Sequence, residues 1–180
     1  MGRQVRELSA TGIYHVFFRG VNHCHLFEAD TDFEKFMSIV ETVKSKLPFD
    51  LYAYVLMSNH VHLLLHEAAI GDIALIMRKV LTQYAFWFNR KYGRSGALIA
   101  DRYKSECVED DAYLLSLTRY IHQNPINAGA AQSLESYRWS SYREYLAEAG
   151  VIAKTDFVLE MMTNGKQSAL AKFVAFHADT

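Results

Sequence analysis

Two histidines separated by one residue, His60 and His62, are the clearest candidate for chemistry in this sequence. In a β-strand, residues two apart point to the same face, so both imidazoles would project together while Val61 faces the other way. Two imidazoles presented on one face of a rigid strand can bind a divalent metal ion. The alternative interpretation is a pair of polar residues on the exposed face of an edge hairpin, and the pattern alone leaves both open.

A tyrosine and an asparagine four residues apart, Tyr120 and Asn124, form a second candidate. On a helix this spacing places the two side chains one above the other on the same face. Because Pro125 biases the preceding residue away from helical geometry, we expect the Asn124 amide to swing off the helix end and act as a third ligand. Two nitrogens, one oxygen and no sulfur suit Mg²⁺ or Mn²⁺ in phosphate chemistry better than a structural zinc ion. The alternative is a half-buried tyrosine with a hydrogen-bonded hydroxyl beside an ordinary helix C-terminal asparagine.

Basic residues are concentrated in one part of the chain, although the formal net charge is only −1. Residues 76–105 contain seven basic residues and one acidic residue, and the rest of the chain contains twelve basic and nineteen acidic residues. Aromatic residues are interleaved with these cations, and this combination favours single-stranded nucleic acid, since cations bind phosphates and flat rings stack on bases. A solvated helix face beside core aromatics would have the same composition. The candidate DNA contacts are Arg78, Lys79, Arg90, Lys91, Arg102, Tyr103 and Lys104, with Trp87 as a weaker stacking candidate.

The elements that would position these residues alternate between extended and helical patterns. We predict strands over 12–19, 50–57 and 60–66, with a tight turn at Ser58-Asn59, and a short extended piece over 102–108. We predict helices over about 32–46, capped by Asp30 or Thr31, and over 72–92. A third helix is predicted from Asp110 or Asp111 to about 123 and is ended by Pro125. A fourth is predicted over 139–148, and two short helices follow it. This order predicts an α+β fold, with a ferredoxin-like or RNA-recognition-like antiparallel sheet and helices on one face.

Length and composition indicate one globular domain. The chain has 180 residues and a mass of 20.6 kDa, and 51% of its residues are hydrophobic. We expect a single domain over 1–180, with 129–180 as a candidate helical appendage. There is no apolar run of the roughly 18 residues that a membrane span needs, and no apolar segment of a secretory signal. With only two cysteines, a reducing compartment is favoured, so we expect a cytoplasmic protein without a membrane partner.

Taken together, these motifs resemble the single-tyrosine HUH transposases of the insertion-sequence-200-like class, and within it the REP-associated tyrosine transposases. The resemblance extends from about Tyr14 to Tyr145, and its landmarks in chain order are YHVFFRGVN, AYVLMSNHVHLLL, GALIADRYKS, YLLSLTRYIHQNP and WSSYREYL. Several ordered motifs are far more specific than any one of them. One departure is Ile99, which stands where the family often has an aromatic residue for base stacking.

The resemblance implies a ferredoxin-like sheet with the tyrosine helix lying over the HUH strand. It implies that His60 and His62 hold a divalent ion, Mg²⁺ or Mn²⁺, and that Asn124 helps to hold it. Tyr120 matches the nucleophile, which would attack single-stranded DNA beside a hairpin and form a 5′-phosphotyrosine from which strands are transferred.

Two other functions stay open at this point. One is a nucleic-acid-binding regulator that keeps the fold without turnover. The other is a related HUH nuclease of replication or plasmid transfer, against which the YIHQNP context and the lack of further domains count. The sequence also leaves open whether the chain forms a homodimer and whether Tyr120 serves its own chain's site or a partner's.

Overall fold

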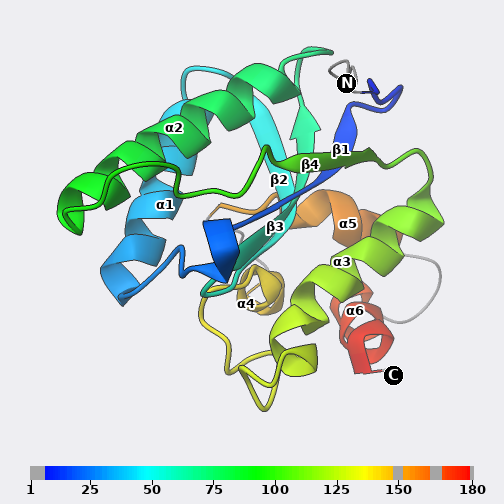
Figure 1. Cartoon of the computed structure of the whole chain (residues 1–180). Coiled ribbons are helices and arrows are strands. Elements are labelled where there is room, and N and C mark those ends of the chain that lie inside the picture. Colours follow the sequence, from blue (N-terminus) through cyan, green and yellow to red (C-terminus); the bar gives the residue numbers. More distant parts are fainter. Residues whose placement is uncertain (1–6, 148–151, 163–167, 179–180) are drawn as a thin grey trace.

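A four-stranded antiparallel sheet forms the centre of the chain in the computed structural model, which describes residues 7–147, 152–162 and 168–178. The strands are β1 (Ile13–Arg19), β2 (Phe49–Leu56), β3 (His60–Glu67) and β4 (Lys104–Cys107), in the spatial order β2-β3-β1-β4 (Figure 1). The hairpin of β2 and β3 turns at the predicted residues, and β1 lies between β3 and β4. The predicted α+β fold with an antiparallel sheet is therefore confirmed.

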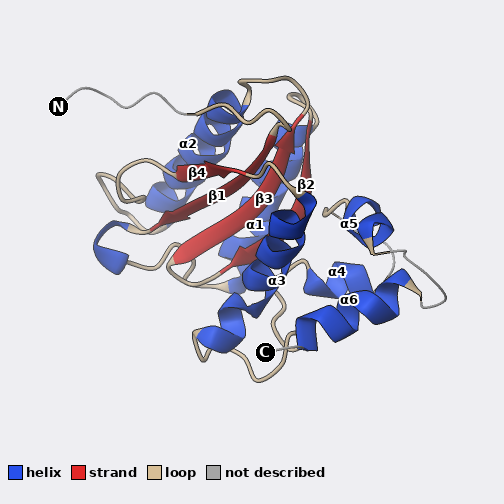
Figure 2. Ribbon diagram, turned by 90° about the vertical axis from the view of Figure 1, so that its right-hand side faces the viewer, coloured by secondary structure: helices blue, strands red, loops and turns tan. Residues whose placement is uncertain are grey.

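Helices cover both faces of this sheet, whereas the order of the elements predicted helices on one face. The helices α1 (Asp30–Lys44) and α2 (Ile73–Lys91) pack on one face, and α3 (Asp111–Asn127) lies over β2 and β3 on the other (Figure 2). A 3₁₀ turn at Val21–His23 follows β1. The predicted arrangement, with the tyrosine helix over the HUH strand, is confirmed.

The alternation of residues along β3 explains how one strand serves two cores. Val61, Leu63 and Leu65 pack into the core that contains α1 and α2, whereas Leu64 packs into the core under α3. His60 and His62 have the same parity as Leu64. Their side chains therefore belong to the face that α3 covers.

The start of α1 corrects one predicted cap. Ala29 is the N-cap residue, and neither Asp30 nor Thr31 has that role. The buried Asp32 carboxylate in the first helical turn accepts hydrogen bonds from the backbone N–H groups of Glu28 and Ala29. Because Asp32 reaches back to these donors, the N-cap residue itself needs no polar side chain.

The end of α3 corrects a second prediction. Asp110 is the N-cap, as predicted, and its carboxylate accepts a hydrogen bond from the Tyr113 backbone N–H at 2.8 Å. The helix does not stop before Pro125 but continues to Asn127. Proline removes only its own backbone donor, and the helix regains a bond at once, since the Ala128 N–H donates to the Asn124 carbonyl. Asn124 therefore lies within the helix instead of swinging off its end.

Three short helices complete the described part of the chain: α4 (Tyr142–Leu146), α5 (Thr155–Met161) and α6 (Ala169–Ala178). The prediction of a helix over 139–148 is wrong at its start, because Ser140 pairs with Val55 as a bridge and extends the β2 edge. Tyr142, Tyr145 and Phe173 pack under α3 in the second core. The interpretation of 129–180 as an appendage stays a prediction.

Among the described residues, no helix combines the length and the apolar character needed to cross a membrane.

Candidate active site

The two histidines of β3 lie together under α3. His62 is only 8% exposed and His60 is half-buried, and their ring centroids are 5.4 Å apart with the planes perpendicular. The strand thus presents both imidazoles from one face, as the sequence predicts.

His60 lies between two asparagines. Its Nδ1 lies 2.7 Å from Asn59 Oδ1, and its Nε2 lies 3.1 Å from Asn124 Oδ1. When Nδ1–H donates to Asn59, the lone pair of Nε2 faces the lone pairs of the Asn124 oxygen. Two acceptors in this position repel each other unless a cation lies beside them.

The separation of these two atoms fits a shared metal ion. An octahedral Mg²⁺ ion with ligands at 2.0–2.1 Å places neighbouring ligand atoms about 3 Å apart. In the described part of the chain, no group of three or more His, Cys, Asp or Glu side chains could hold a metal ion. The groups that would hold an ion here are two imidazoles and an amide oxygen, without a thiolate. Such a set would leave positions for water and phosphate oxygens, which are the ligands that Mg²⁺ and Mn²⁺ prefer.

His62 is oriented from below by a residue that the sequence reasoning missed. His15 of β1 places its Nε2 2.9 Å from His62 Nδ1, and its Nδ1 lies 3.5 Å from Glu106 Oε2. If each Nδ1–H points along this chain toward Glu106, the Nε2 of His62 is left free as a metal ligand. The strand pattern does indicate the face of His15, since His15 and Phe17 alternate with core residues on β1. The β1–β3 register pairs His15 with Leu64 and Phe17 with His62, so His15 lies diagonally beside His62, and only the side-chain contact shows that the two rings meet.

Burial keeps both of these imidazoles neutral. Burial, followed by the nearby His15 and His60, lowers the pKa of His62 to about 3. Burial also lowers the pKa of His15, against the opposing effect of Glu106. A neutral imidazole is the form that binds a metal ion, so burial prepares His62 for that role and leaves His15 neutral beside it.

Tyr120 completes the group within the same chain. Its ring meets His62 edge-on, with centroids 5.6 Å apart, and meets His15 edge-on at 6.2 Å. The side chain is 46% exposed, so solvent and a substrate can reach it. Leu117 and Ile121 on the buried side of α3 pack against the sheet and hold the helix in this position.

Two cavities adjoin His62 and differ in charge. One, of about 370 Å³, is lined by both candidate metal ligands of β3, by the three cations Arg19, Arg102 and Lys104, and by one acidic residue, Asp101. The other, of about 420 Å³, is lined by Tyr120, Tyr113 and Ser116, and its charged side chain is Glu106. The first cavity is called the basic cavity below, because its cations suit a phosphate backbone.

The other predicted DNA contacts are dispersed. Lys79 and Arg90 are exposed on α2, on the far side of the sheet from Tyr120. Lys91 forms an ion pair with buried Asp32. Tyr103 is 8% exposed and packs in the core with α1 and α2. Arg102 and Lys104 are thus the predicted contacts that the fold brings to the histidines.

A family model and two relatives match this chain. The model described as "Transposase IS200 like" matches residues 9–124, a range that contains the histidines and Tyr120 and ends at Asn124. A Haemophilus influenzae protein assigned as a REP-associated tyrosine transposase is 25% identical over 160 residues, which cover 82% of this chain and 90% of that protein. A REP-associated tyrosine transposase solved in complex with a REP hairpin has the same fold, with a TM-score of 0.69 and 18% identity over 82% of this chain and 86% of that one.

Proposed function

Because the chain belongs to the IS200-like transposase family, whose members cleave and transfer DNA strands, we propose that it cuts single-stranded DNA with Tyr120 as the nucleophile. The observation that carries the proposal is the meeting of Tyr120 with His62, at 5.6 Å between ring centroids, beside the His60–Asn124 pair. Two elements far apart in the sequence, β3 and α3, converge there.

His60, His62 and Asn124 are the residues that would hold Mg²⁺ or Mn²⁺. A bound divalent ion supplies charge withdrawal from the scissile phosphate and helps to orient it. The buried His15 keeps the His62 ring in place, and Asn59 does the same for His60. These ligands are uncharged, so the positive charge of the ion would not be offset by the protein.

The covalent step exchanges one phosphoester bond for another. The Tyr120 oxygen attacks phosphorus, the bond from phosphorus to the 3′-oxygen breaks, and the tyrosine proton passes to solvent while the leaving oxygen takes one up. The products are a 5′-phosphotyrosine and a free 3′-hydroxyl. A second 3′-hydroxyl can then displace the tyrosine, so strands are joined without an external energy source.

A single strand beside a hairpin is the proposed substrate. The solved relative binds a REP hairpin, which supports a folded DNA partner for this chain too. The basic cavity supports the same choice, because Arg102 and Lys104 stand beside the histidines, where the strand must pass. The position of Tyr120 supports its action at the histidines of its own chain, and a homodimer stays a prediction.

The test is covalent capture of DNA. The chain is incubated with hairpin-flanked single-stranded oligonucleotides and Mn²⁺, and denaturing gels are examined for a protein–DNA adduct. We expect an adduct that is lost in Tyr120→Phe, because the phenyl ring retains the packing but lacks the nucleophilic oxygen.

His60→Ala is the companion variant. It should abolish adduct formation while hairpin affinity stays within a few-fold, since His60 is proposed to hold the ion and not the hairpin. If the unaltered chain binds hairpins but forms no adduct with any member of a broad oligonucleotide set, the alternative function of a nucleic-acid-binding regulator is favoured instead. An adduct that persists in Tyr120→Phe would refute Tyr120 as the nucleophile.

A further inference from the structure

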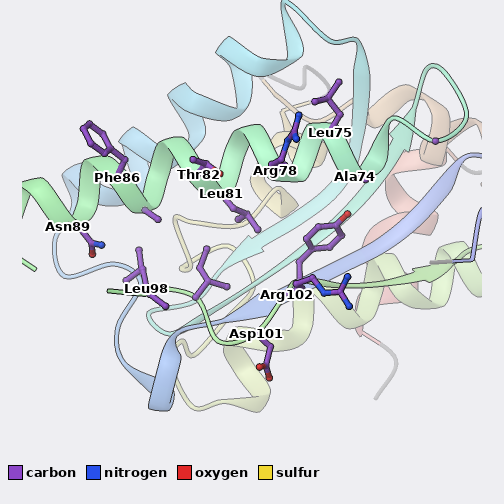
Figure 3. A pocket seen from close by; sticks show the side chains of 15 residues that line it. Ala74, Leu75, Arg78, Leu81, Thr82, Phe86, Asn89, Leu98, Asp101 and Arg102 are labelled. Atoms are coloured by element: carbon purple, nitrogen blue, oxygen red, sulfur yellow. The ribbon is translucent and has the colours of Figure 1, made fainter. Parts of the chain in front are cut away.

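A long groove runs between α2 and the segment 97–103, away from the histidines. It has a volume of about 860 Å³, within the usual range of ligand pockets. We call it the α2 groove and define it by Leu75, Arg78, Leu81 and Phe86 of α2 and by Leu98 and Arg102 of the facing segment. In Figure 3, Arg78 and Phe86 stand on the helix side, Arg102 stands on the opposite side, and Leu81 and Leu98 lie between the two sides.

Phe86 is the aromatic residue on this surface that is free to stack. It is 70% exposed, whereas the predicted stacking residue Trp87 is partly buried against Tyr84 at a ring distance of 5.9 Å. When a ligand covers one face of an exposed aromatic ring, apolar surface is removed from water, and this favours binding. Nucleobases are suitable partners because each has a flat face.

The charges on the two sides of the groove select the kind of partner. Arg78 and Arg102 are exposed, and neither forms an ion pair with a carboxylate in the described part of the chain. Asp101 is the acidic residue of the lining, and its side chain points away from α2 in Figure 3. Two unpaired cations flanking an apolar floor suit a strand whose bases are apolar and whose backbone is anionic.

The α2 groove also continues into the basic cavity. Asp101 and Arg102 line both, so Arg102 stands at the junction. The cavity on the other side of His62 has Glu106 as its charged side chain, which repels a phosphate backbone. A strand that leaves the histidines is therefore drawn toward α2 and not toward Glu106.

From these features we infer that the α2 groove binds unpaired nucleotides that flank the cleaved phosphate, with a base on Phe86 and phosphates on Arg78 and Arg102. The inference rests on the proposed function and adds to it a path for the strand. In this inference Phe86 stacks on a base. Arg102 contacts the strand both in the α2 groove and in the basic cavity.

The test measures binding of a labelled oligothymidylate of about twelve nucleotides to the full chain by fluorescence anisotropy, without added metal. We expect Phe86→Ala to weaken binding roughly fivefold or more, since stacking on one base is lost. Arg78→Gln should weaken binding several-fold and make the salt dependence shallower by about 0.7 in the log–log slope.

Matched controls separate the groove from general effects. Ile70→Ala removes an equally exposed apolar side chain, and Arg143→Gln removes an exposed cation from α4 on the other face of the sheet. Both should change affinity less than about twofold. A loss in Phe86→Ala or Arg78→Gln no larger than in these controls would overturn the proposal.

Two further measurements decide between explanations. Iododeoxyuridine placed within the same oligonucleotide should crosslink on illumination to peptides of α2 or of 97–103. Crosslinks confined to other peptides would refute the α2 groove as the binding site. If the chain forms a dimer that Phe86→Ala dissociates, the groove is a protein interface and the proposal fails.

Failure of the groove and failure of the proposed function give different results. Oligothymidylate binding that depends on Phe86, without any covalent adduct, would retain the groove and reject cleavage. If Phe86→Ala leaves the affinity for oligothymidylate unchanged while the covalent adduct forms normally, the groove is rejected and cleavage is retained.

Discussion

His15 holds the ring of His62 from beneath, with its Nε2 2.9 Å from His62 Nδ1. Its own Nδ1 is buried without a hydrogen-bond partner in the described structure, and Glu106 Oε2 is 3.5 Å away on an exposed side chain. A small movement of Glu106 would complete the chain of hydrogen bonds. Partners of this kind set the tautomer of a ligating histidine, so we assign His15 a positioning role.

At the residue scale we predict that His15→Phe weakens Mn²⁺ binding about 10- to 100-fold. The ring volume is retained, but His62 loses the acceptor for its Nδ1–H. Calorimetric titration with Mn²⁺ measures the affinity, and ¹⁵N chemical shifts of His62 report its tautomer without any metal. His25→Phe, at an exposed histidine, is the control. Unchanged Mn²⁺ affinity together with an unchanged His62 tautomer would contradict the assignment.

Among the elements, α1 and α2 are tied together at one point by Asp32. This carboxylate is fully buried, accepts two backbone N–H groups at the start of α1, and binds Lys91 and the Tyr92 hydroxyl at the end of α2. Burial alone would raise its pKa, but Lys91 and the other donors hold the pKa of Asp32 below its usual value. The Lys91 ammonium is therefore already bound to Asp32, and a DNA phosphate would have to compete with that carboxylate for it.

At this scale we predict that Asp32→Ala lowers the free energy of unfolding by roughly 2–4 kcal/mol, because helix-start donors and Lys91 lose their acceptor together. Urea unfolding measures the change. Asp30→Ala is the matched control two residues earlier; its carboxylate is exposed and pairs with exposed Arg138, so about 0–1 kcal/mol is expected. Equal losses in the two variants would show that Asp32 does not connect the helices.

For the whole molecule, a buried chain of hydrogen bonds joins α6 to α3 and to β2. The Phe173 carbonyl can only accept, so His177 Nδ1 donates to it, and His177 Nε2 then accepts from His122 Nδ1–H at 2.9 Å. His122 Nε2 accepts from the Ser141 hydroxyl at 2.8 Å, and Ser141 Oγ accepts from the Tyr54 N–H. In this chain each imidazole donates through Nδ1 and accepts through Nε2. Protonation of either ring would turn its accepting nitrogen into a donor and break one of these hydrogen bonds.

We therefore predict that acid weakens the fold. Burial lowers the pKa of His177 to about 4 and that of His122 well below its ordinary value of 6.5. As pH falls from 6.5 toward 4, the unfolded chain binds protons that the folded chain does not, so stability is lost in this window, by up to roughly 3 kcal/mol for His177. Urea unfolding between pH 7 and 4 measures the slope.

His177→Gln isolates this contribution. It should reduce the slope near pH 5 by about 1.4 kcal/mol per pH unit, which corresponds to one proton. His25→Gln, at an exposed position, should leave the slope unchanged. A slope in His177→Gln equal to that of the unaltered chain would exclude His177 as its source.

Much of the candidate site could be predicted from the sequence because it depends on local geometry. The two-residue spacing of His60 and His62 places them on one face of any strand, and the four-residue spacing of Tyr120 and Asn124 does the same on any helix. The element order likewise predicted the antiparallel sheet, whereas the position of the tyrosine helix above it was implied by the family resemblance. The two spacings require only the repeat of a single element.

The remaining features depend on contacts between elements that are distant in the chain. The pairing of β1 with β3 places His15 diagonally beside His62, with Phe17 directly opposite His62. The packing of α2 decides that Phe86 is exposed while Trp87 is partly buried. The helix α3 also continues through Pro125 to Asn127, against the local preference for a stop. The sequence thus determined which side chains share a face, and only the tertiary structure decided which faces meet, because the separation between elements is set by the two cores that fill the space between them.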